Sequence, residues 1–105
     1  MLHIYTDVLD HLRDLRGPIQ AIARQDRDLA RQLRRAAASV LLNLAEGAGR
    51  RAGHARERFG TALGSAMEVR ACLDAADALG YFPGLDPDEA DRMDKIIATL
   101  WRLAR

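Results

Sequence analysis

Apolar residues recur at helical spacing along nearly the whole chain, and no stretch alternates between apolar and polar residues for long enough to predict a strand. In the first segment the apolar positions are Tyr5, Val8, Leu12, Leu15, Ile19 and Ile22. Their spacings of three and four residues place them on one face of a helix, which is expected to be buried. Pro18 lacks a backbone N–H and crowds the preceding turn, so we expect a kink or a break near residues 14–17. The register continues beyond Pro18, which favours the kink.

Local signals divide the rest of the chain into three more helices. Asp26 is expected to cap the second helix, which ends around residues 46–49 where Gly47 and Gly49 lie. Asp86 and Pro87 start the fourth helix, with a glutamate three residues after the cap. The expected helices span residues 3–24, 27–47, 53–79 and 87–104. They predict a single all-α domain over residues 1–105, an up-down-up-down antiparallel four-helix bundle.

The composition is that of a globular protein and excludes several classes. Hydrophobic residues make up 49% and charged residues 30% of the chain, which argues against a disordered protein. No apolar run approaches the ~20 residues that cross a bilayer, and the first residues do not resemble a signal peptide. The single cysteine, Cys72, cannot form an internal disulfide. We therefore expect a cytoplasmic protein without a membrane partner.

The net charge of +1 conceals a strong polarity along the chain. Residues 24–58 hold nine arginines against four acids, and residues 59–95 hold three basic residues against eight acids. The candidate nucleic-acid-binding residues lie in the basic part: Arg24, Arg27, Arg31, Arg34, Arg35, Arg50 and Arg51. Five of them fall opposite the apolar face of the second helix, where guanidinium groups can bind phosphates. The alternative is an ordinary solvated face. Because no aromatics are interleaved, any binding should follow backbone and shape rather than base sequence.

Signals for catalysis or metal binding are weak. His3, Asp7 and His11 are spaced by four residues and can in principle bind a transition metal, but we favour a solvated face near a frayed terminus. Residues 47–52 match a G-x-G-x-x-A string, yet a helix precedes them where the dinucleotide motif needs a strand. No serine, threonine or cysteine has a sequence-local partner that indicates a nucleophile. We expect no catalysis, no metal and no cofactor.

Several segments resemble the four helix bundle protein family, also called the 23S rRNA-intervening-sequence protein family. They are QLRRAAASV (residues 32–40), NLAEG (43–47), Arg50 and Arg51, Phe59, ALGS (62–65), Glu68 and LGY (79–81). The resemblance spans about residues 31–82 and implies a homopentameric ring with no established catalysis. Some members are encoded inside intervening sequences of 23S rRNA genes. A related branch, the accessory variability determinants of diversity-generating retroelements, binds nucleic acid and a reverse transcriptase through a basic surface.

We interpret seven residues of the shared motif as architectural: Asn43, Glu46, Gly47, Phe59, Gly64, Ser65 and Glu68. Asn43 and Glu46 can tie the glycine-rich turn to the third helix. Gly64 and Ser65 are small enough to let the second and third helices approach closely. Glu46 and Glu68 are expected to pair with arginines or cap backbone groups rather than to act as paired catalytic carboxylates.

Two functions follow from these patterns. The favoured one is a non-enzymatic oligomer that binds structured nucleic acid, RNA or RNA/DNA, through its arginine face. The alternative is a protein-interaction scaffold that docks a partner such as a reverse transcriptase and has little nucleic-acid affinity of its own. In the second case the charge polarity can serve contacts between copies of the chain.

Overall fold

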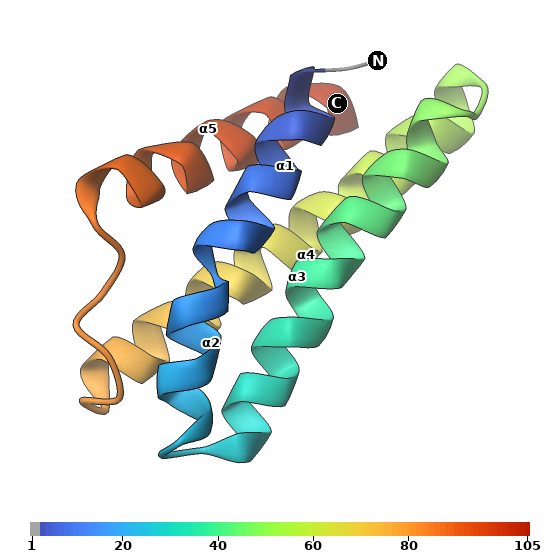
Figure 1. The fold of residues 1–105 in the computed structure, drawn as a ribbon. Coiled ribbons are helices and arrows are strands. Elements are labelled where there is room, and N and C mark those ends of the chain that lie inside the picture. The colour runs from blue at the N-terminus through green and yellow to red at the C-terminus, as the bar shows by residue number, and fades with distance from the viewer. Residues whose placement is uncertain (1–2) are drawn as a thin grey trace.

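The computed structural model describes residues 3–105, which form helices and contain no strand. The helices are α1 (His3–Asp14), α2 (Arg16–Ala23), α3 (Arg27–Ala48), α4 (Ala52–Ala78) and α5 (Pro87–Ala104). In Figure 1, α2 continues the course of α1. We call α1 and α2 together the first rod; α3, α4 and α5 are the other three rods of the fold. The predicted all-α fold with four helices is confirmed. Within these residues, no helix has both the length and the apolar character needed to span a membrane.

The first rod is kinked at Leu15, between α1 and α2. Leu15 keeps a helical backbone conformation, and its N–H donates to the carbonyl of His11 at 3.0 Å. Its own carbonyl accepts from the N–H of Ile19 at 2.9 Å. Pro18 has no N–H to give to the carbonyl of Asp14. The backbone hydrogen bonds before and after Leu15 are therefore kept, while the helix axis bends there. The segment expected to be one helix at residues 3–24 is divided into two helices.

The buried stripe of this rod differs from the predicted one. Its members are Ile4, Val8, His11, Leu15 and Ile22. Tyr5, Leu12 and Ile19, which we expected to be buried, flank the stripe and are half-exposed. The two sets share three members, and the buried set has spacings of three or four residues up to Leu15, followed by one of seven to Ile22. The predicted stripe contains only apolar residues, whereas the buried stripe includes His11. A prediction based on apolar residues therefore selects the wrong stripe.

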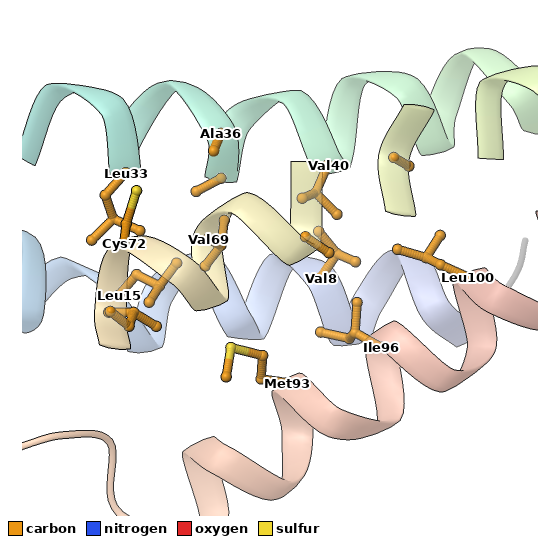
Figure 2. Close-up of a cluster of buried hydrophobic side chains, with 14 of the residues drawn as sticks. Val8, Leu15, Leu33, Ala36, Val40, Val69, Cys72, Met93, Ile96 and Leu100 are labelled. Carbon is orange, nitrogen blue, oxygen red and sulfur yellow. The ribbon is translucent and has the colours of Figure 1, made fainter. Parts of the chain in front are cut away.

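The central pair of the fold is α3 and α4, which lie side by side and are joined by residues 49–51 (Figure 1). Figure 2 shows the core between the rods, where Leu33 and Val40 of α3 lie near Val69 and Cys72 of α4. The other two rods contribute Val8, Leu15, Met93, Ile96 and Leu100. Six of the buried core residues are alanines: Ala30, Ala36, Ala37, Ala62, Ala66 and Ala76. Short side chains at these positions let the helix backbones approach closely.

Both helix starts that the sequence marks have their caps. The carboxylate of Asp26 accepts from the N–H of Leu29 at 2.9 Å. At the start of α5, Asp86 accepts from the N–H of Glu89 at 2.9 Å, while Glu89 accepts from the N–H of Asp86 at 3.2 Å. These bonds satisfy backbone donors that have no partner within the helix. Gly80, with a positive φ of 79°, turns the chain after α4.

Candidate nucleic-acid interface

The arginines that the sequence singles out are all exposed, but they form two groups. The N-terminal arginine group comprises Arg24, Arg27, Arg31, Arg34 and Arg35. The turn arginines, Arg50 and Arg51, follow the C-terminal end of α3. At a rise of 1.5 Å per residue, Arg27 lies about 30 Å along the helix axis from the C-terminal end of α3. Arg50 and Arg51 therefore lie at the other end of α3 from the N-terminal arginine group.

An apolar strip lies between the two groups on the outward side of α3. It consists of Ala38, Leu42 and Ala45, all exposed, with 66% of Leu42 open to solvent. Spacings of four and three residues continue the row that starts at Arg31 and Arg35. The strip has no charge to hold a phosphate, so a polyanion would engage one arginine group at a time or bridge both.

Ion pairs engage only some of these guanidinium groups. Arg31 lies 3.1 Å from Asp28, and Arg50 lies 2.6 Å from Glu46. Both pairs are exposed and local, so they contribute little and can open for a competing phosphate. Among residues 3–105, no ion pair holds four members of the N-terminal arginine group: Arg24, Arg27, Arg34 and Arg35. Four guanidinium groups there are thus free to bind anions.

One basic residue near this group was missed by the sequence reasoning. Arg16, at the start of α2, lines a surface groove with Arg34 of α3. Leu12 and Ile19 lie in the same groove. Arg16 precedes the basic part of the chain by eight residues, so a local charge count gives no signal for it. Packing of the first rod against α3 brings the two arginines to one groove.

A polar network connects α3 to α4 beside the arginine group. The hydroxyls of Ser39 and Ser65 are hydrogen-bonded at 2.7 Å across the two helices. The amide of Asn43 donates to the carbonyl of Ser39 at 2.9 Å and accepts from Arg58 at 3.2 Å. Arg35 and Glu68 line the shallow surface groove above these contacts. The network is partly buried and fixes how the two central helices meet.

The glycine-rich turn is held by Glu46 and by the fit of Gly47 against α4. Glu46 pairs with Arg50 and lies 3.9 Å from Arg58. A Cβ on Gly47 would lie 2.7 Å from Cε1 of Phe59, a buried ring. Only glycine permits this approach without a shift of the ring or of the helix.

Gly64 does not contribute to close packing of α3 and α4, contrary to expectation. It is exposed, and a Cβ built there would meet no atom within 4 Å. Its place on the outward side of α4 follows from the helix rotation relative to Ser65, which faces Ser39.

These two glycines give a matched stability test. We expect Gly47→Ala to lower the free energy of unfolding by about 1–3 kcal/mol, because the added methyl overpacks the Phe59 site. Gly64→Ala should raise it by about 0.5–1 kcal/mol, because alanine restricts the unfolded chain and favours the helix. Urea unfolding followed by circular dichroism measures both. Equal effects of the two substitutions would contradict the assignment of Gly47 to the helix contact.

His11 lies in the core, not on the solvated face expected for His3, Asp7 and His11. Only 2% of it is exposed, whereas His3 and Asp7 are open to solvent. Each step of four residues rotates a helical position by about 40°, and two steps turn His11 inward. Burial, and then the charge of Arg92, lowers the pKa of His11 to about 4. Within residues 3–105, no three His, Cys, Asp or Glu side chains are grouped to hold a metal ion.

Cys72 is likewise a core residue. Burial, and then the charge of Glu68, raises the pKa of its thiol. A thiol held in its protonated form is a poor nucleophile. The side chain fills space between α3 and α4 as a small apolar group (Figure 2).

Comparison with known proteins places these features in a family. The model of the 23S rRNA-intervening sequence protein family matches residues 19–103. The chain belongs to this family. No curated protein and no solved structure matches it. The matched region includes both arginine groups and the Ser39–Ser65 contact.

The chemistry of the interface is in keeping with a member of the 23S rRNA-intervening sequence protein family, which is a helical-bundle family and not a known enzyme family. The groups that the structure gathers at the surface of α3 are cations and hydrogen-bonding side chains. Guanidinium groups bind phosphate oxygens with two donors each. The arrangement can therefore hold a polyanion.

Proposed function

We propose that this protein is a non-enzymatic oligomer that binds structured RNA, or RNA/DNA, through the N-terminal arginine group. The observation that carries the proposal is the set of four exposed guanidinium groups between residues 24 and 35, which no ion pair holds among residues 3–105. The family's link to 23S rRNA intervening sequences supports RNA as the polyanion. The turn arginines, Arg50 and Arg51, are a second anchor for a long ligand.

We propose further that the helices follow an up-down-up-down antiparallel course and that the subunits form a homopentameric ring in the cytoplasm. Large apolar side chains left open to solvent support self-association: Leu42, Met67, Leu79 and Trp101. A ring would repeat the N-terminal arginine group on every subunit. Repeated weak phosphate contacts then add to a high overall affinity.

Fluorescence anisotropy of a labelled, structured RNA across a salt series tests the RNA proposal. Because phosphate binding releases counterions, the logarithm of the association constant should fall linearly with the logarithm of salt concentration. Four arginine contacts predict a slope of about −3. Absence of binding even at low salt would contradict the proposal.

A second candidate function is a scaffold that docks a partner protein such as a reverse transcriptase. The apolar strip of Ala38, Leu42 and Ala45 favours it, because an exposed leucine between two charged groups is typical of protein interfaces. The scaffold predicts no RNA binding in the salt series. It also predicts that Leu42→Glu abolishes capture of the purified partner, whereas reversal of Arg27 does not.

A further inference from the structure

The outward side of α5 carries an unpartnered aromatic residue. Trp101 is the only tryptophan of the chain, and 61% of it is exposed. Leu100 and Ile96 point into the core (Figure 2), and a turn of about 100° per residue takes Trp101 away from them to the exposed side of the helix. Water contact over such a large apolar ring is unfavourable, and tryptophan is enriched at the centres of protein interfaces.

The residues before Trp101 on the same side of α5 are small or acidic. Ala98, Asp94 and Asp91 precede it at spacings of three, four and three residues, and all are exposed. Asp94 forms an ion pair with Arg70 of α4, yet most of its side chain is open to solvent. Asp91 has no ion pair within residues 3–105. We call Asp91, Asp94, Ala98 and Trp101 the acidic–aromatic stripe.

A groove with the complementary character lies between the first rod and α3. Its apolar residues are Leu12, Ile19, Ala37 and Ala38, and its polar residues are Arg16, Gln20 and Arg34. Leu12 and Ile19 are the half-exposed positions that flank the buried stripe of the first rod. Neither arginine has an ion pair among the described residues. We call this set the α2–α3 groove.

We propose that the acidic–aromatic stripe of one copy docks in the α2–α3 groove of a second copy of this chain. Trp101 packs on the apolar floor between Leu12 and Ile19, and the two aspartates of the stripe lie near Arg16 and Arg34. This contact uses Arg34 and leaves the other four members of the N-terminal arginine group for a polyanion. The occupant is inferred from complementarity: an apolar floor receives the indole, and two cations meet two carboxylates. This inference deepens the proposed assembly and rests on it.

The stripe and the groove have similar lengths. Asp94 and Trp101 are seven residues apart on α5, which is about 10 Å of helix, and Leu12 and Ile19 are seven residues apart on the first rod. The two surfaces are different patches of the molecule, and such a contact joins copies head to tail. Head-to-tail contacts close into rings or continue as filaments.

The single tryptophan makes the contact directly measurable. In a protein concentration series without nucleic acid, tryptophan emission should shift to shorter wavelength as Trp101 leaves water. Sedimentation velocity on the same samples should show the shift rising with the oligomer fraction. Trp101→Ala should weaken self-association by at least about tenfold, the change expected from losing a central aromatic contact.

Charge exchange tests the geometry of the contact. Arg16→Asp with Arg34→Asp should weaken self-association at least about tenfold, and so should Asp91→Arg with Asp94→Arg. Mixing the two variants should restore association, because each groove then meets a stripe of opposite charge. The matched control is Arg24→Asp with Arg27→Asp, which makes the same charge change outside the groove and should leave assembly unchanged. Circular dichroism checks that every variant keeps its helical content.

The outcomes separate this inference from the proposed assembly. A protein that stays monomeric at every concentration overturns both. An oligomer whose emission does not shift, or that survives both pairs of charge reversals, overturns the docking contact alone. RNA binding by such an oligomer would leave the proposed function standing.

Discussion

Reversing Arg27 and Arg35 to glutamate is expected to lower the affinity for structured RNA on the order of 100-fold at low salt. Both side chains are exposed and have no ion pair within residues 3–105, so the loss falls on phosphate contacts and not on the fold. The new carboxylates also repel the phosphates that the arginines attracted. With two fewer contacts, the salt slope should become shallower by about 2. Fluorescence anisotropy measures both quantities.

The matched control reverses Lys95 of α5 and Arg105, which follows the last residue of α5; both are exposed. This variant changes the net charge by the same amount, so a general loss of attraction would affect both proteins alike. We expect the control to lose less than about fivefold in affinity at low salt. If the two variants lose affinity equally, RNA is held by the overall charge of the protein and the N-terminal arginine group is not the site.

The sequence was sufficient to predict the starts of α3 and α5. Their starts are set by local chemistry: a capping carboxylate at Asp26, and the Asp86 box with its proline and glutamate. It was less able to predict which face is buried, as the first rod shows. Two faces of that rod carry heptad spacing, and the choice between them depends on the neighbouring helices. A polar residue such as His11 enters the core only because tertiary packing places it there.

The candidate site was predicted in part. Helical rotation places Arg31 and Arg35 on the outward side of α3, and this follows from spacing alone. Arg16 and Arg34 line the same groove because the first rod packs against α3. A local sequence pattern cannot predict that these two residues lie close together. The same holds for Gly64. The small size of Gly64 suggested a helix contact. However, Ser65 faces Ser39 of α3, so Gly64 lies on the outward side of α4.

Acidification from pH 6.5 to pH 4 is expected to remove about 3 kcal/mol of stability through His11 alone. The folded protein holds the pKa of His11 at about 4, below its ordinary value of 6.5, because of burial and the nearby charge of Arg92. Between these values the unfolded chain binds a proton that the folded chain does not, so the free energy of unfolding falls as the pH falls. Below pH 4 this contribution is fully lost.

Two carboxyls act in the opposite sense. Burial raises the pKa of Asp14, although the charge of Arg92 opposes this effect. Burial also raises the pKa of Glu89, although its hydrogen bond with the backbone of Asp86 opposes this effect. A raised carboxyl pKa means that the folded state binds protons more readily, which stabilises it on acidification. The measured pH profile is therefore the sum of two opposing contributions. A variant that removes only the imidazole separates them.

His11→Leu provides this separation, because leucine fills the site and cannot bind a proton. Its free energy of unfolding, from urea titrations at several pH values, should fall about 3 kcal/mol less than that of the wild type between pH 6.5 and pH 4. The carboxyls remain in both proteins, so the difference reports His11. Parallel profiles of wild type and His11→Leu would mean that the folded protein admits a proton to His11 as easily as the unfolded chain does.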